Sequence, residues 1–291
     1  MLQAPEEWRR AYRDDGFLIV PDLLDSALVS ALRDGLDKIT GGVASLPPHL
    51  REKIFLERDH VRNNPQWYTG ILAPEDCGGA VRQVADLGLF ARAFADLICH
   101  PPFLQVLETL FASPEFSFTY MVGRPKAARV GNGISNGNFH RDAPFEDTTS
   151  TDTVIALLCL DGMTGDNGGT NFIRGSHKVT DEEAADPRWR EVAADRLDLR
   201  ERVDVRCPAG AAVFFSSKVL HAAGHNRSDH PRRTILSEWA GPGVLPTSPV
   251  RYAYQGLRPR SQDPLYQKQT RMTFPHLSAV RRRDKQGGNG R

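Results

Sequence analysis

Apolar residues in the first part of the chain recur at the spacing of a buried helix face. The clearest set is separated by three or four residues and consists of Leu28, Leu32, Leu36 and Ile39. Asp25, just before them, is a typical helix N-cap, so the pattern predicts a helix that begins at this residue. Charge-rich or amphipathic runs predict three further helices, over residues 5–14, 81–100 and 101–111.

Two other features interrupt this helical region. The apolar run Phe17–Val20 is followed by Pro21, which predicts a short strand. Residues 41–80 contain four prolines and several glycines, and this composition favours loops and short turns. We therefore expect the first 115 residues to be helix-rich, with one strand near their start.

The pattern changes at about Phe116, where short runs of strand-forming residues begin to alternate with turn residues. These runs are FSFTYMVG, TVIALLCL, TNFIRG, RVDVRC, AAVFFS and RRTILSEW. Strands that are joined by turns rather than by helices are typical of an antiparallel sandwich or barrel. The expected fold class is therefore mainly β with an α cover, in which helices pack on a jelly-roll core.

We expect one domain over residues 1–280. In this interpretation residues 1–115 are helix-rich, residues from about 116 to 245 form the β core, and residues 246–280 are a C-terminal extension. Residues 281–291 (RRRDKQGGNGR) contain no apolar residue, and this predicts a disordered tail.

Charge and composition narrow the kinds of partner. The 291 residues include 37 basic and 36 acidic side chains, a net charge of +1, so no overall field favours nucleic acid or anionic lipid. The chain has no secretory signal pattern at its start, and no apolar run reaches the roughly 18 residues of a spanning helix. We expect a cytoplasmic protein with a small-molecule substrate and with neither nucleic acid nor a membrane as a partner. The residues do not indicate an oligomeric state.

Candidate chemistry lies in the stretch NFHRDAPFED, residues 138–147. Residues i and i+2 of a strand share a face, so His140 and Asp142 would present an imidazole and a carboxylate side by side, with Arg141 facing the other way. Two ligands cannot hold a metal tightly, and a third is needed. His221 is the best candidate, because it ends an apolar strand that follows the turn sequence CPAG, and antiparallel pairing can bring that strand end beside the first.

Two histidines and one carboxylate are the ligand set of non-haem Fe(II) oxygenases, which keep further coordination positions open. Arg232 follows His221 by eleven residues, on the next predicted strand. Its planar guanidinium group suits a carboxylate and is the expected handle for a keto acid. Neighbouring residues of a strand face opposite ways, so Arg233 is the alternative.

The order of these motifs resembles the phytanoyl-CoA dioxygenase-like group of Fe(II)/2-oxoglutarate-dependent oxygenases. Besides the HxD pair, the resemblance rests on DGFLIVPDLLD, DNGGTNFIRGSHK, PAGAAVFFSSKVLHAAGHN and HAAGHNRSDHPRR. It implies a double-stranded β-helix core, the jelly roll that cupins also have. It implies that His140, Asp142 and His221 bind Fe(II), that Arg232 binds the distal carboxylate of the co-substrate 2-oxoglutarate, and that O₂ is the oxidant.

Five further positions are less specific. Asn138 shares the predicted face of the first metal ligand and Thr153 opens the next strand, so both are candidates for cofactor binding, in contact with 2-oxoglutarate. Arg124, Phe139 and Trp239 are candidates for substrate binding. Ordinary packing, turn or surface roles are the alternative for each of them.

These observations predict a dioxygenase that hydroxylates or otherwise oxidises a C–H bond of a small organic substrate while 2-oxoglutarate is decarboxylated to succinate. The resemblance also disfavours halogenation, because Asp142 fills the position that related halogenases leave to the halide. Desaturation, epimerisation and ring closure stay open. The alternatives are a non-catalytic jelly-roll protein that binds a metal or a small molecule, and a non-oxidative jelly-roll enzyme that uses another metal. A kinase loop is disfavoured, because HRD here lacks the required Asn five residues after the Asp.

Overall fold

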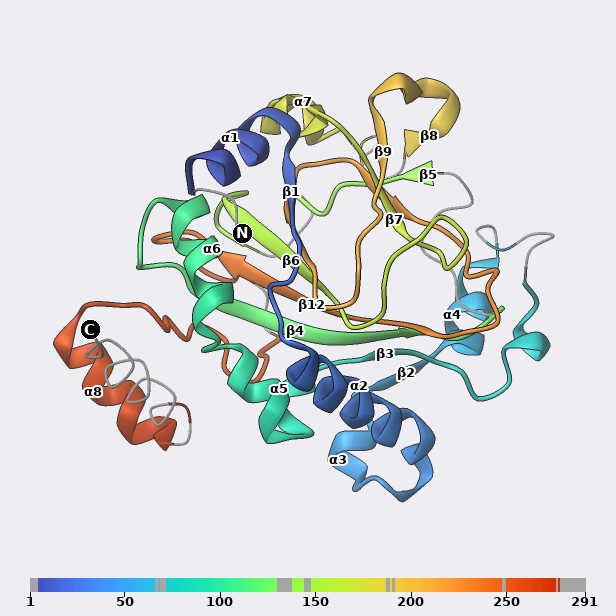
Figure 1. Ribbon diagram of the computed structural model, residues 1–291, viewed down its shortest axis with the longest axis horizontal. Coiled ribbons are helices and arrows are strands. Elements are labelled where there is room, and N and C mark those ends of the chain that lie inside the picture. The colour runs from blue at the N-terminus through green and yellow to red at the C-terminus, as the bar shows by residue number, and fades with distance from the viewer. Residues whose placement is uncertain are drawn as a thin grey trace.

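A computed structural model of the chain describes residues 5–65, 68, 72–129, 138–143, 148–186, 189, 192–247, 250–275 and 277. Two antiparallel sheets form its centre (Figure 1). The major sheet has, in spatial order, the strands β1 (Phe17–Val20), β10 (Ala212–Ser216), β6 (Thr153–Cys159), β12 (Arg232–Ala240), β4 (Ser117–Lys126), β3 (Val81–Val84) and β2 (Ile54–Leu56). The minor sheet has the strands β11 (His221–Ala223), β7 (Thr170–Ile173) and β9 (Arg202–Asp204). A separate short pair is formed by β5 (Asn138–Phe139) and β8 (Val192–Ala193).

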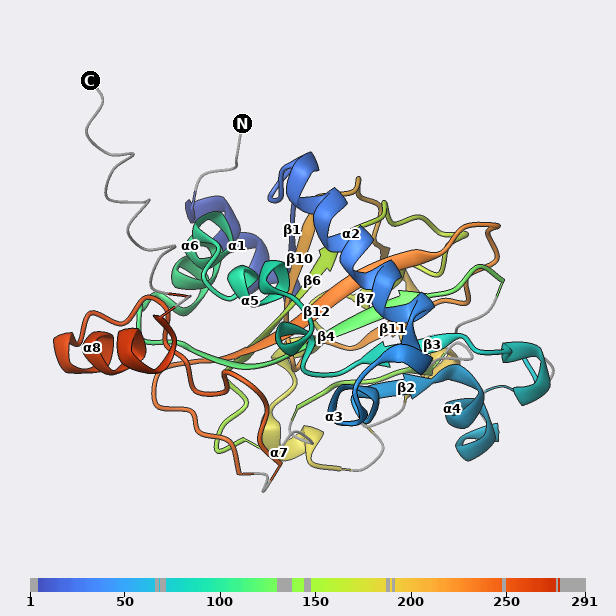
Figure 2. The same cartoon turned by 90° about the horizontal axis from the view of Figure 1, so that it is seen from below.

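Several helices cover the major sheet on the side away from the minor sheet. In the described residues the α-helices are α1 (Pro5–Asp15), α2 (Ser26–Gly41), α3 (Pro48–Arg51), α4 (Glu57–Asn63), α5 (Arg92–Leu97), α6 (Pro101–Phe111), α7 (Asp181–Ala184) and α8 (Pro264–Thr273). Figures 1 and 2 show α1, α2, α5 and α6 along one side of the sheet. Asp25 caps α2 by accepting a hydrogen bond from the backbone N–H of Leu28 (2.8 Å). The apolar face of α2 is therefore fixed against the sheet.

The core has two main parts, one on each face of the major sheet. On the outer face Trp239 packs against Phe103, Phe116 and Phe118, with ring centroids 5.2–5.7 Å apart. On the inner face a second cluster joins strands of both sheets, and Phe172 of β7 packs on Phe215 of β10. Strand alternation thus builds two cores from the same strands.

Most predicted elements are confirmed. The antiparallel strands with flanking helices match the predicted fold class, and α1, α2, α6 and β1 agree with their sequence patterns. The helix predicted over residues 81–100 is wrong. Its first residues form β3, which pairs with β2 and β4, and only Leu87–Leu89 and α5 are helical. Sheet pairing overrides the local helical periodicity there.

Other expectations need smaller corrections. Within residues 41–80, expected as loops and turns, the chain forms α3, β2 and α4. Strands β1, β2 and β3 also join the major sheet, so the helix-rich segment contributes directly to the β core. The predicted tail, residues 281–291, lies outside the described residues.

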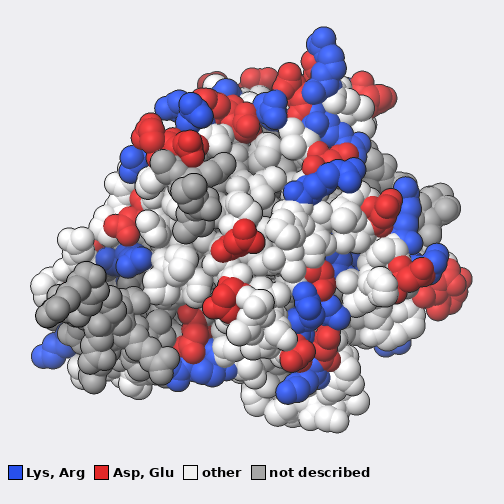
Figure 3. All heavy atoms as spheres, viewed as in Figure 1, with Lys and Arg blue, Asp and Glu red and all other residues white. Residues whose placement is uncertain are grey.

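Two surface properties bear on possible partners. No α-helix in the described ranges is both long and apolar enough to cross a membrane. Figure 3 shows acidic and basic side chains interspersed over one face of the molecule, without a large area of a single sign. This mixture of signs on that face agrees with the nearly equal numbers of basic and acidic residues in the sequence.

Candidate metal centre and its cavity

Backbone pairing brings the two candidate histidines together. His140 directly follows β5 and His221 begins β11, and the two form an isolated antiparallel bridge. The N–H of each donates to the carbonyl of the other, at 3.0 and 2.9 Å. The imidazole rings consequently lie side by side, with centroids 4.1 Å apart. Arg141 lies away from them, over the ring of Trp189.

Asp142 completes the group although it lies beyond the end of the strand. The backbone N–H groups of Asp142 and Ala143 both donate to the carbonyl of Ser217 (3.0 Å each), which fixes the turn. Its Oδ1 lies 3.7 Å from Nε2 of His140 and its Oδ2 lies 3.7 Å from Nε2 of His221. The structure therefore brings together the three side chains that the sequence predicts as metal ligands.

The donor set fits a divalent metal ion. One ligand atom from each of the three residues lies within 4.8 Å of the others. Two donors bonded at about 2.0–2.2 Å to one ion stand at most roughly 4.4 Å apart, so the 3.7 Å separations leave room for an ion between them. Burial lowers the pKa of His140 well below its usual range, and His221 lowers it further. This imidazole is therefore neutral, the state that a metal requires.

His221 has its ring orientation set by the backbone. Its Nδ1 lies 3.1 Å from the carbonyl oxygen of Val219, which fits an N–H donor at Nδ1 and leaves the lone pair on Nε2, the atom that faces Asp142. Burial is the main influence on Asp142 and raises the pKa of its carboxyl group, while His221 and Arg124 act in the opposite direction.

The three side chains lie at one cavity of about 160 Å³ between the sheets. Its apolar walls include Ile155, Leu157, Phe215 and Leu236. Its charged walls carry, besides the aspartate of the triad, Glu57, Arg82, Arg124, Lys126 and Arg232. The cavity is therefore small, partly apolar and rich in basic groups.

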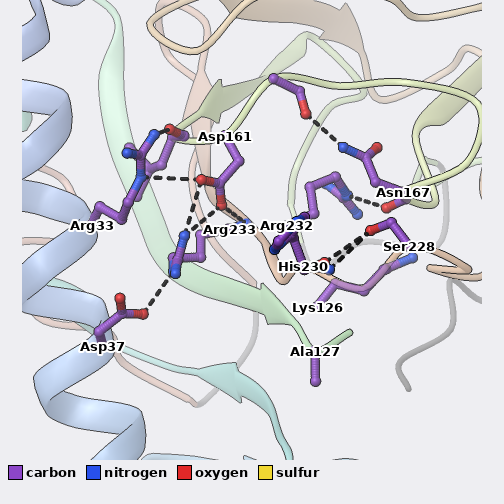
Figure 4. A network of polar contacts seen from close by, with 12 residues as sticks. Arg33, Asp37, Lys126, Ala127, Asp161, Asn167, Ser228, His230, Arg232 and Arg233 are labelled. Atoms are coloured by element: carbon purple, nitrogen blue, oxygen red, sulfur yellow. Dashed lines mark hydrogen bonds and ion pairs between the residues drawn. The ribbon is translucent and has the colours of Figure 1, made fainter. Parts of the chain in front are cut away.

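Arg232 lines this cavity and Arg233 does not. Figure 4 shows Arg233 beside Asp161 and Asp37, and Arg232 on the side of Asn167. Arg232 opens β12 opposite Lys126 of β4, and its Nε donates to the carbonyl of Asn167 (3.1 Å). Arg233 points to the outer face, where it pairs with Asp37 (2.6 Å) and Asp161 (2.9 Å). Of the two arginines that the sequence leaves as alternatives, Arg232 alone is placed to meet a ligand of the cavity.

Three other predicted site residues do not line the cavity. Phe139 is buried in a small core with Ile173 and Leu220, and Trp239 belongs to the outer core. Side chains of a strand alternate between its faces, and Trp239 is on the outer face of β12. Thr153 donates a hydrogen bond from its hydroxyl group to that of Ser217 (2.6 Å), so it braces the turn that holds Asp142. The side chain of Asn138 lies outside the described residues.

The sequence reasoning missed a polar group from the helix-rich segment. Nη1 of Arg82 on β3 lies 3.3 Å from Oε1 of Glu57 on α4, and it donates to the hydroxyl group of Tyr68 (3.3 Å). Both charged residues line the cavity. The sequence gives little indication of these two residues, because residues 41–80 contain many turn residues and the apolar spacing of residues 81–100 favours a helix over the strand β3.

A jelly roll that holds two histidines and a carboxylate at an inner cavity is typical of non-haem iron oxygenases. A family model described as phytanoyl-CoA dioxygenase matches residues 12–234, more than half of the chain. The chain belongs to this family of Fe(II)/2-oxoglutarate-dependent oxygenases.

Individual relatives are distant. The chain is 26% identical to dioxygenase aneA of Aspergillus aculeatus over 59% of this chain, and the match spans 55% of that protein, about half of its length. It is 24% identical to dioxygenase hkm4 of Aspergillus hancockii, over 91% of this chain and 80% of that protein. A crystal structure of the epimerase SnoN in complex with Fe³⁺, α-ketoglutarate and nogalamycin RO has a TM-score of 0.61 at 21% identity, covering 89% of this chain and 96% of that one. At such identity the structural likeness shows the fold.

Proposed function

We propose that this protein is an Fe(II)/2-oxoglutarate-dependent dioxygenase that oxidises a C–H bond of a small organic substrate, most simply by hydroxylation. In this proposal His140, Asp142 and His221 hold the iron and Arg232 binds the distal carboxylate of 2-oxoglutarate. The observation that carries it is the presence of the triad and of Arg232 in one cavity.

The residues around the triad would hold it ready for the metal. The His140–His221 bridge and the Ser217 carbonyl fix the backbone of the ligands, so metal binding costs little conformational entropy. When bound, ferrous iron would supply oxidation by O₂ coupled to decarboxylation of 2-oxoglutarate to succinate and CO₂. The nearby apolar side chains, among them Leu157 and Phe215, would exclude bulk water.

Arg232 is suited to a carboxylate because its position is already fixed. The bond from Nε to the Asn167 carbonyl holds the guanidinium group, and its terminal nitrogens make no hydrogen bond or ion pair with the described residues. Burial lowers its pKa, but an arginine stays charged at neutral pH. A buried guanidinium without a full set of partners binds a carboxylate through two parallel hydrogen bonds.

The test is succinate formation by the purified protein with Fe(II), 2-oxoglutarate and O₂, compared with Asp142→Ala. We expect slow succinate formation by the wild-type protein alone, faster formation with an accepted substrate, and neither in the variant. If the wild-type protein retains iron but forms no succinate with any of a broad set of small molecules, a binding protein is favoured instead. Turnover with zinc and without consumption of 2-oxoglutarate would favour a non-oxidative enzyme.

A further inference from the structure

One cationic side chain of the cavity has no role in the proposed function so far. Arg124 lies on β4 in register with Thr234 of β12, next to the Lys126–Arg232 pair on the same inner face. It makes no hydrogen bond or ion pair with any described residue. It lines the same cavity as His140, Asp142 and His221.

The other fixed charges of the cavity have partners or would gain them. Arg82 pairs with Glu57. The ammonium group of Lys126 donates to the carbonyl of Gly224 (2.5 Å) and reaches that of Gly168 (3.5 Å). With both cofactors bound, Arg232 would face one carboxylate of 2-oxoglutarate, while Asp142 and the other carboxylate would balance ferrous iron. Of the cavity's described cations, Arg124 alone makes neither a hydrogen bond nor an ion pair. Asp142 and Glu57 raise its pKa through their charge, but Asp142 would balance the iron and Glu57 pairs with Arg82.

Arg124 is half-buried, and a cation that is largely removed from water without a paired anion is costly. Burial lowers the pKa of Arg124 to about 10, so the group is still positively charged at neutral pH. The remaining space of the cavity beside the triad is where the substrate would have to lie. A guanidinium in that space is most stable when the substrate itself supplies the negative charge.

We infer that the substrate carries an anionic group, a carboxylate or a phosphate, and that Arg124 binds this group next to the metal centre. The inference rests on the proposed function and adds the class of substrate to it. An anion held by Arg124 would place the carbon atoms adjacent to it beside the triad, where the oxidation would occur. Arg124 is thus a residue that determines specificity.

The experiment separates this site from the co-substrate site. Binding of 2-oxoglutarate to the Fe(II) protein without O₂ is followed by the visible charge-transfer band, in the wild type, Arg124→Met, Arg124→Lys and Arg232→Met. Inorganic phosphate and acetate are then titrated into the Fe(II)/2-oxoglutarate complexes by calorimetry. Arg129→Met is the matched control, because Arg129 follows the same strand but is exposed and pairs with Asp229. Thermal melting checks that each variant is folded.

We expect Arg124→Met to bind 2-oxoglutarate within about threefold of the wild type and to bind one or both anions at least tenfold more weakly, with Arg124→Lys intermediate and Arg129→Met unchanged. A set of small carboxylic acids, each tested beside its primary amide, should stimulate succinate formation preferentially as the acid, and Arg124→Met should lose that preference.

The inference is overturned if Arg124→Met loses 2-oxoglutarate binding as Arg232→Met does, or if wild type and Arg124→Met bind the anions alike or not at all. Failure of the proposed function looks different, because the wild type would then form no charge-transfer band.

Discussion

The two faces of strands β4 and β12 differ in whether their arginines form ion pairs. On the outer face Arg233 contacts Asp37 and Asp161, and Asp161 also pairs with Arg33 (3.1 Å). On the inner face Arg124 forms no ion pair with a carboxylate of the described residues, and Arg232 has one backbone hydrogen-bond partner among them. Both faces are built by the same hydrogen-bonded ladder.

Along a single strand, the residues of the outer face therefore contribute to stability, and the residues of the inner face are available for ligand binding. The outer face has its charges compensated within the chain and its large aromatic residues packed under helices, so it stabilises the fold. On the inner face Arg124 and Arg232 form no ion pair with the described residues, so a bound anion can compensate their charge. Substitutions at adjacent positions of β12 should therefore have different consequences, and the following experiments use this contrast.

The largest effect on stability is expected at Trp239, on the outer face. Trp239→Ala removes a buried ring that contacts three phenylalanines, and it should lower the free energy of unfolding by about 3–5 kcal/mol. The folded fraction should bind 2-oxoglutarate as the wild type does. Denaturant titration and the charge-transfer band measure the two quantities. A folded variant with weakened co-substrate binding would place Trp239 in the site after all.

Arg232→Met should have the reverse pattern. Loss of charge-assisted hydrogen bonds worth about 1.5–3 kcal/mol should raise the Kd for 2-oxoglutarate roughly 10- to 100-fold. Stability should change little, because no carboxylate of the described chain depends on this guanidinium group. Titration of the Fe(II) protein with 2-oxoglutarate is the measurement, and an unchanged Kd would contradict the assignment of Arg232.

Its neighbour provides the sharpest control. Arg233→Met removes the pairs with Asp37 and Asp161 and should cost about 1 kcal/mol of stability, since Arg33 still accompanies Asp161. The Kd for 2-oxoglutarate should stay at the wild-type value. If the two variants showed the same co-substrate defect, the contrast between the two faces would be wrong.

The smallest expected effect is electrostatic. Burial, reinforced by Arg82 and Arg124, lowers the pKa of His60 to about 4. Arg124→Met should raise that pKa, and an NMR titration would detect the change. The pKa of His60 is lower in the folded state than the usual 6.5, so protonation favours the unfolded chain. The contribution of His60 to the free energy of unfolding is therefore fully present above about pH 6.5 and is lost as the pH falls towards 4. The variant should lose less over the same range.

Sequence patterns predicted the fold where local and tertiary preferences agree. The three- to four-residue periodicity of α2 and its Asp25 cap are local signals, and the structure keeps both. Residues 81–84 show the limit. Their apolar spacing suits a helix, but pairing with β4 makes them a strand, and that pairing joins positions about 40 residues apart in the chain.

The site was predictable to the extent that strand alternation applies. The HxD spacing and the strand before His221 indicated the triad, although Asp142 lies beyond the end of its strand, where its backbone N–H is held by the Ser217 carbonyl. Alternation also predicted that only one of Arg232 and Arg233 faces inward. It did not reveal Arg82 or Glu57 as cavity residues, because their positions depend on how the helix-rich segment packs against the sheet.

The most direct test of the central claim is the iron content of the protein after reconstitution without O₂. The wild type and His230→Ala, which changes an exposed histidine near the site in sequence, should each hold a single iron ion per chain. His140→Ala, Asp142→Ala and His221→Ala should fold, as judged by circular dichroism, and should lose most of the metal. Iron retained at the wild-type level in these three folded variants would contradict the assignment of the metal centre.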